Sequence, residues 1–240
     1  MNSLITEGKN SQCEYCQRRD ITLVAKTGYG PSEKSTQLLG ADHVVYLALF
    51  SENLIKVGVD LWDRRQIRVT EQGAIASIFI ARGSGTVARN LESRIRRRIG
   101  FTEWVRSKTK LSGLGSIIDT RKAEIILKDS YDKVLSNANS TAIINLDYTY
   151  LADRYSISDN VGLCPIEYIE TVSGGATIFG TIAGIYGKII LLINGKKLYA
   201  LDSSLICGYS LTKPYTCSES SDLIGITTKL IDINLQQSLF

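Results

Sequence analysis

The sequence predicts an α+β fold in which a small helix-flanked sheet precedes an all-β, barrel-like domain. Between residues 43 and 99, short runs of β-branched and aromatic residues alternate with amphipathic stretches. From residue 176 onward, apolar runs are punctuated by glycines, a pattern typical of short antiparallel strands. The 240 residues are enough for one large domain or two small ones.

The first block predicts the order strand, strand, helix, strand, helix. The expected elements are 43–50, 54–59, 60–74, 75–83 and 86–99. Asp60 is a good N-cap residue for the first helix, and Gly100 is a natural stop for the second. A longer amphipathic helix is expected at about 116–136, whereas residues 140–175 are ambiguous.

The last block predicts a small antiparallel barrel or sandwich. Asn194-Gly195 between two apolar runs is a type I′ hairpin signal, and residues 223–235 are a candidate for one more strand. The predicted organisation is therefore a polar segment (1–40), a sheet domain (41–114), a connecting helix (115–139) and a β-rich domain (140–240).

Basic residues gather in one part of the chain. Residues 56–110 hold 13 basic and five acidic residues, a local excess of +8, whereas the whole chain carries +4. This distribution is typical of a protein with a polyanionic partner such as nucleic acid, although a salt-bridged helix surface would look the same. The candidate contacts are Arg64, Arg65, Arg94, Arg96, Arg97, Arg98, Arg106, Lys108 and Lys110.

Tyr and Trp are not interleaved among these cations at base-stacking spacing, so single-strand recognition is not indicated. The longest apolar runs are far below the roughly 18 residues of a membrane span, and the polar start has no signal region. A cytoplasmic protein without a membrane partner is therefore expected.

Glu92 is the one acid in the most basic run, "ARNLESRIRRRIGF" (88–101). On a helical projection it lies at the edge of the apolar face, beside Leu91 and Ile95. A partly covered carboxylate needs a cation, a donor or a metal. Arg89 and Arg96 are within helical reach of it, so a local ion pair and a metal ligand both remain open.

Three stretches of the chain carry a resemblance to a known family. They are "VYLALFSENLIKVGVDLWDRRQIRVTEQGA" (45–74), "NLESRIRRRIGFTEW" (90–104) and "FGTIAGIYGKIILLINGKKLYALDSSLICGYS" (179–210). The chain resembles an uncharacterised family of GIY-YIG nuclease-superfamily relatives with a C-terminal β segment. This resemblance implies a GIY-YIG-like three-stranded sheet with flanking helices.

The resemblance also implies roles for four residues. Tyr46 matches the tyrosine of the first tripeptide, Arg68 the arginine that contacts the scissile phosphate, and Glu92 the ligand of one divalent cation, Mg²⁺ or Mn²⁺. Gly58 matches the glycine of the second tripeptide. Lys56 stands where that tripeptide often has tyrosine, and Glu103 where the superfamily has a late asparagine.

Relatives tend to carry clustered cysteines that resemble a zinc module before the nuclease-like block. Here that region holds only Cys13 and Cys16. A tetrahedral zinc site needs four ligands, so a remnant thiol pair and an incomplete structural zinc site both remain open.

Three functions remain open. The first is a metal-dependent endonuclease that hydrolyses phosphodiester bonds in DNA or structured RNA, with Tyr46, Lys56, Arg68 and Glu92 as its site. The second is an inactive module that binds RNA or a ribonucleoprotein through the same basic face. The third is a protein-interaction scaffold. The basic residues serve the first two equally, because phosphate contacts position a ligand without specifying its sequence.

Overall fold

The computed structural model describes residues 39–112, 118–138, 147–155, 165–207 and 224–231. These residues form two compact units, one within 39–155 and the other within 165–231, and each is described by itself. Within the described ranges, no helix is both long and apolar enough to cross a membrane.

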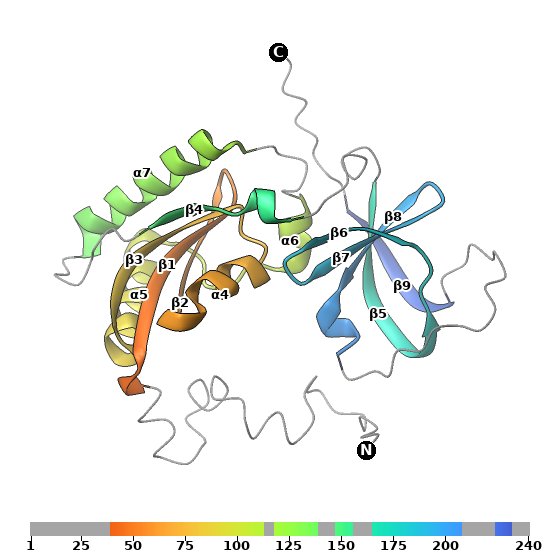
Figure 1. Ribbon diagram of the computed structural model, residues 1–240, viewed down its shortest axis with the longest axis horizontal. Helices are drawn as coiled ribbons and strands as arrows, with labels where there is room; N and C mark the ends of the chain where they lie inside the picture. Colours follow the sequence, from red (N-terminus) through yellow and green to blue (C-terminus); the bar gives the residue numbers. More distant parts are fainter. Residues whose placement is uncertain (1–38, 113–117, 139–146, 156–164, 208–223, 232–240) are drawn as a thin grey trace. The chain divides into compact units, whose positions relative to one another are not determined.

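The first unit is built on an antiparallel sheet of four strands in the order β2-β1-β3-β4 (Figure 1). Its elements in chain order are β1 (Asp42–Ser51), β2 (Leu54–Leu61), η1 (Trp62–Arg64), α4 (Arg65–Glu71), β3 (Ala76–Ser84), α5 (Gly85–Ile99), α6 (Ser107–Ser112), α7 (Thr120–Ala138), β4 (Tyr148–Tyr150) and η2 (Ala152–Arg154). The predicted α+β class is confirmed. The expected three-stranded sheet has a fourth strand, β4, which comes from the ambiguous stretch and pairs with β3.

The predicted helix 60–74 is wrong at its start. Asp60 does not cap a helix, because its backbone pairs with Val44 in the β1–β2 ladder. The chain then makes one 3₁₀ turn, and α4 begins only at Arg65. The predicted helix at about 116–136 is α7, which begins at Thr120, while residues 113–117 lie outside the described ranges.

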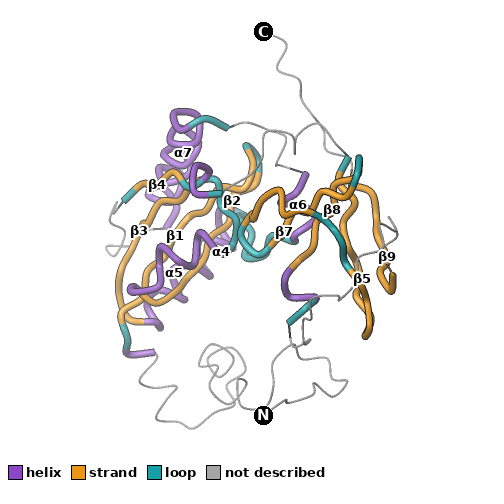
Figure 2. The backbone as a smooth tube through the Cα atoms, turned by 45° about the vertical axis from the view of Figure 1, so that its right-hand side comes forward, coloured by secondary structure: helices purple, strands orange, loops and turns teal. Residues whose placement is uncertain are grey.

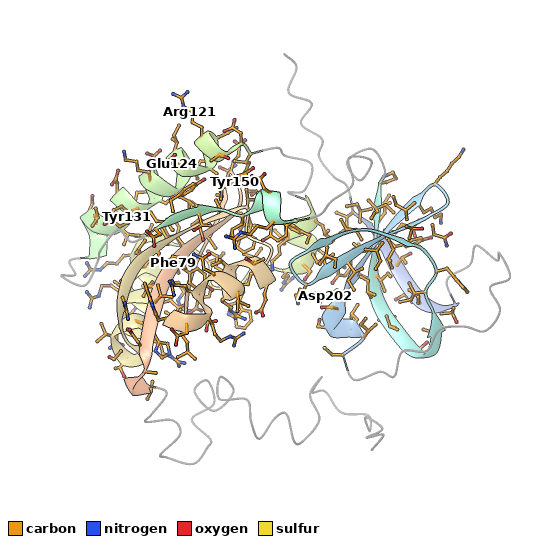
Figure 3. All side chains as sticks on the ribbon, in the orientation of Figure 1. Phe79, Arg121, Glu124, Tyr131, Tyr150 and Asp202 are labelled. Carbon is orange, nitrogen blue, oxygen red and sulfur yellow. The ribbon has the colours of Figure 1, made fainter. Side chains whose placement is uncertain are left out.

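The two faces of the sheet carry different cores because neighbouring strand residues point to opposite sides. On one face, Val45 and Leu47 of β1 pack with α5 and α7. On the other face, Tyr46 packs with Val69 of α4 and with Phe79 of β3, which is labelled in Figure 3. The sheet is therefore covered on both sides, and α4 shares a side with Tyr46.

Helix α5 is amphipathic and ends as predicted. Ala88, Leu91 and Ile95 are buried against the sheet. Gly100 closes the helix in the left-handed conformation (φ 85°), and its backbone N–H donates to the carbonyl oxygen of Arg96. Glycine reaches this conformation without a Cβ penalty.

The second unit is a sheet of five strands in the order β6-β7-β8-β5-β9, seen as orange tube in Figure 2. Its elements are β5 (Ile166–Thr177), β6 (Thr181–Tyr186), β7 (Ile189–Asn194), β8 (Lys197–Asp202), η4 (Ser203–Leu205) and β9 (Ile224–Ile231). The candidate strand in 223–235 is present as β9. The hairpin signalled by Asn194-Gly195 joins β7 to β8, with Asn194 paired to Lys197 and Gly195 at φ 60°.

The predicted barrel is not found among the described residues. The strand order leaves β6 at one edge and β9 at the other, so the sheet stays open. Short strands separated by glycines suit an open sheet and a barrel equally well. Closure requires the two edge strands to meet, and no local pattern in the sequence encodes that contact.

Candidate functional site

Tyr46 lies across the neighbouring strand. It pairs with Gly58 of β2, and a Cβ placed on Gly58 would lie 2.4 Å from the Tyr46 hydroxyl oxygen. The phenol ring therefore occupies the space above Gly58, and only glycine leaves room for it there. Lys56 and Asp60 flank Gly58 at alternate positions of β2, so both side chains share this face.

Gln72 joins Tyr46 to Lys56. It follows the last residue of α4, where its side-chain Nε2 donates to the Tyr46 hydroxyl at 2.8 Å. Lys56 Nζ in turn donates to Gln72 Oε1 at 2.7 Å. Lys110 Nζ holds the backbone of the same residue by donating to the Gln72 carbonyl oxygen at 2.5 Å.

Arg68 is the charged neighbour of Tyr46 on α4. It lies one helical turn before Gln72, and its positive charge lowers the pKa of the Tyr46 hydroxyl. Its Nε is 3.2 Å from Asp60 Oδ2, an ion pair in which the N–H is not aligned on the oxygen. The Arg68 side chain remains 38% exposed, so part of its guanidinium faces solvent.

The Tyr46 hydroxyl is held as a neutral phenol. Burial raises its pKa above the ordinary value of 10.0, while the hydrogen bond from Gln72 and the positive charge of Arg68 act in the opposite direction. The oxygen accepts from Gln72, so the phenol keeps its own proton for donation at neutral pH.

Glu92 lies on α5 at the border of the buried face, as the helical projection predicts. It is partly buried next to Leu91 and Ile95. Burial, and then the charge of Glu103, raise the pKa of its carboxyl to about 7 against the opposing charges of Lys56, Arg89 and Arg96. Glu92 thus shares the electrostatic environment of Lys56.

The local ion pair considered for Glu92 is not formed with Arg96, because Arg96 Nη1 donates to Glu103 Oε2 at 2.5 Å. Across the described ranges, no lysine or arginine forms an ion pair with Glu92. The carboxyl is therefore a partly buried acid whose positive neighbours act from a distance.

The chain after α5 returns to the edge of β2. The N–H of Val57 donates to the Thr102 carbonyl oxygen at 3.0 Å, and the N–H of Thr102 donates to the Ile55 carbonyl oxygen at 3.3 Å. Thr102 therefore lies beside Lys56 in a parallel bridge. This pairing fixes Glu103 close to the Lys56 end of the network.

The predicted nucleic-acid contacts divide by exposure. The exposed group is Arg64, Arg96, Arg97, Arg98 and Arg106, and the partly buried group is Arg65, Arg94 and Lys108. Lys110 is only 5% exposed, and it lies over the Phe50 ring. Its ammonium group therefore serves the interior of the unit rather than its solvent-facing surface.

Several of these cations already contact the protein itself. Arg64 pairs with Glu71 at 3.6 Å, Arg97 Nε donates to the carbonyl oxygen of Ser93, and Arg98 Nη1 donates to that of Asn137 at 2.7 Å. Such exposed contacts are weak, so these arginines can exchange them for phosphate oxygens.

A complete protein-only metal cluster is not present in the part of the chain that the structure describes, since no three His, Cys, Asp or Glu side chains gather there. The candidate zinc ligands Cys13 and Cys16 lie outside the described residues. A divalent cation at Glu92 would therefore depend on that carboxylate, with Glu103 close by, and on water.

Two members of the network were not identified from the sequence. Gln72 belongs to the stretch "QGA" quoted for the resemblance, and its role depends on where α4 ends. Asp60 is two residues beyond Gly58, so strand alternation would have placed it on the Tyr46 face. The strand alternation at Asp60 was not recognised because Asp60 stood at the start of the expected helix 60–74.

Comparison with known proteins places the chain in a family. No curated protein and no solved structure matches the chain. The model of a family described as "protein of unknown function (DUF2797)" matches residues 9–211. This range covers well over half of the chain and includes β1 to β8 and all the site residues described above. The chain therefore belongs to the DUF2797 family.

Proposed function

We propose that the first unit is a phosphodiesterase of the GIY-YIG type that cleaves DNA or structured RNA. The observation that carries the proposal is the hydrogen-bonded chain from Tyr46 through Gln72 to Lys56. The charge of Arg68 acts on Tyr46, and Glu92 lies in the electrostatic environment of Lys56. The element order of the unit, strand, strand, helix, strand, helix, agrees with the superfamily.

In this proposal Arg68 binds the nonbridging oxygens of the scissile phosphate. A planar guanidinium presents several donors and suits this task, and the exposed part of Arg68 is available for it. Tyr46 presents its phenolic proton, which orients the attacking water by donation. Gln72 keeps the Tyr46 oxygen in place and connects it to the positive charge of Lys56.

A divalent cation fits the carboxyl of Glu92. Burial and Glu103 disfavour its charged form, and a cation would relieve both effects. Mg²⁺ is commonly held by one or two carboxylates and several waters, so Glu92 would hold Mg²⁺ or Mn²⁺. When bound, the ion would neutralise charge on the leaving oxygen.

The decisive experiment is a cleavage assay on a panel of branched DNA and folded RNA with Mg²⁺ or Mn²⁺. We expect cleavage by the wild type and a loss of about 10³-fold in Glu92→Gln, since metal-assisted charge stabilisation is worth several kcal/mol. Binding of the same substrates should persist in the variant. Glu71→Gln, at an exposed acid of α4, is the matched control and should cleave normally.

A nucleic-acid-binding module without cleavage is the second candidate, and one observation favours it. The Arg68 guanidinium already has an anionic partner in Asp60. If every substrate in the panel is bound but left intact in the presence of either metal, the cleavage proposal is abandoned in favour of this one.

A further inference from the structure

Trp104 is the most exposed large apolar side chain among the described residues, at 74%. A side chain of this size usually buries most of its surface in the fold or in an interface. Trp104 follows Glu103 in the segment whose Thr102 pairs with Lys56 of β2.

The backbone of Trp104 is held firmly. The Thr102 hydroxyl donates to the Trp104 carbonyl oxygen at 2.8 Å and accepts from the Trp104 N–H at 3.1 Å. Thr102 is itself bonded to β2 on both sides, through Val57 and Ile55. The exposed indole therefore projects from a segment attached to the sheet and not from a free loop.

The attachment also fixes the distance to the site. Thr102 pairs with Lys56, and two residues of extended chain span at most about 7 Å between Cα atoms. Trp104 thus lies a short distance from the Lys56 end of the network. The indole therefore belongs to the segment that borders β2 at Lys56.

The other tryptophan cannot take this role. The guanidinium carbons of Arg65 and Arg82 lie 3.8 and 4.0 Å from the centre of the Trp62 ring. Two guanidinium groups this close to the ring centre would overlap on one face, so they cover both faces. Trp62 is a structural residue with no face left for a ligand.

We propose that Trp104 stacks on an unpaired nucleobase next to the scissile phosphate. Every base has a π-face that an aromatic side chain can bind, whereas a base inside a continuous duplex already has both faces stacked. The substrate class would then be nucleic acid with an unpaired nucleotide at the cleavage point, such as a bulge, a loop or a branch. This proposal deepens the proposed function and rests on it for the phosphate site.

The charges around the indole favour this occupant over an apolar protein surface. Glu103 precedes the indole, and Glu103 forms an ion pair with the exposed Arg96. The exposed Arg106 follows Trp104 by two residues. Glutamate is depleted from protein–protein interfaces, and Glu103 adjoins the indole. Arginines are the usual neighbours of a stacking residue that binds a phosphate-linked base.

The test measures fluorescence anisotropy of labelled duplexes in EDTA, where no divalent cation is present. Two duplexes are compared that differ only by one unpaired nucleotide. We expect the wild type to bind the bulged duplex about 10-fold more tightly. Trp104→Leu should lose this preference and keep its affinity for the paired duplex, and Trp104→Phe should keep most of the preference.

Ile125→Ala, which shortens another exposed apolar side chain on α7, is the matched control and should leave the preference unchanged. Equal affinity of the wild type for the two duplexes would overturn the proposal, as would an unchanged preference in Trp104→Leu. If the stacking proposal is overturned and Trp104→Leu also loses a protein complex that the wild type forms, the surface around Trp104 would be assigned to a protein partner.

The two proposals fail in distinguishable ways. A Trp104-dependent preference without any cleavage would leave the stacking site standing and remove the endonuclease. Cleavage that depends on Glu92, without a Trp104-dependent preference for the bulged duplex, would support the endonuclease and remove the stacking site. If neither duplex is bound at all, both proposals are overturned.

Discussion

At the scale of single residues, the contact between Tyr46 and Gly58 explains why the second strand carries a glycine. The Tyr46 ring is almost fully buried, and it fills the space that a side chain on Gly58 would need. The glycine is thus required by a neighbouring strand and not by its own backbone conformation.

Gly58→Ala should therefore destabilise the first unit by about 1–3 kcal/mol, the usual range for overpacking a core. Chemical denaturation measures this. The cost should shrink in a Tyr46→Ala background, because the two changes affect the same contact. Gly40→Ala is the control, since a Cβ there meets nothing within 4 Å. Equal costs in both backgrounds would contradict the packing argument.

Glu92 gives the metal-free protein a pH dependence. Its pKa is raised from 4.5 to about 7 on folding, so the folded state binds the proton more tightly than the unfolded chain. The resulting stabilisation is complete below pH 4.5 and is lost as pH rises through about 7. We expect it to amount to about 3 kcal/mol.

The measurement is the unfolding free energy of the wild type and of Glu92→Gln between pH 5 and 8 in EDTA. Other titrating groups cancel in the difference between the two proteins. The wild type should lose stability relative to the variant as the pH rises, and parallel curves would show that Glu92 is not perturbed by folding.

At the scale of elements, the C-terminal end of helix α4 positions a residue of the candidate site. Gln72 follows its last residue, and its carbonyl oxygen accepts from the buried Lys110 of α6. A cation at a helix C-terminus is favourable, and this one also fixes the residue that joins Tyr46 to Lys56. Helix α6 thus contributes to the site through a structural contact.

Lys110→Met should distinguish a structural role of Lys110 from a role in binding phosphate. The substitution keeps an unbranched apolar stem over Phe50 and removes the ammonium group, leaving the Gln72 carbonyl oxygen without that donor. We expect a loss of about 1–3 kcal/mol in denaturation experiments. The salt dependence of nucleic-acid binding should not change. A weaker salt dependence would instead place Lys110 among the phosphate contacts.

At the scale of the whole molecule, charge is concentrated in the first unit. The excess of +8 in residues 56–110 lies within it, and the exposed arginines of α5 carry much of this excess. Under the proposed function these arginines contact phosphates and release counterions, so nucleic-acid affinity should fall steeply with salt.

Arg96→Ala combined with Arg97→Ala should weaken binding and reduce the slope of log K against log salt by about 1–2. Affinity measured from 50 to 300 mM salt tests this. Arg121→Ala provides the control, because Arg121 is an exposed cation on α7 that projects away from the sheet (Figure 3). A slope that is unchanged in the double variant would exclude these two arginines from the phosphate-binding surface.

The sequence predicted the elements whose signals are local. The strands from residues 43 to 83, the helix ending at Gly100 and the Glu92 position at the edge of its apolar face follow from periodicity and capping. The hairpin at Asn194 follows from turn chemistry in the same way. Each depends on residues within a few positions of one another.

Tertiary structure alone decided the features that depend on distant residues. Asp60 continues β2 because it pairs with Val44, β4 joins the first sheet because it reaches β3, and the C-terminal sheet stays open because its edge strands do not pair within the described residues. Gln72 became part of the site because Tyr46, Lys56 and Lys110 approach it from three other elements. Hydrogen bonds between segments far apart in the chain have no local sequence signal. The sequence by itself thus determined which residue types could form the candidate site, and folding determined which of them meet.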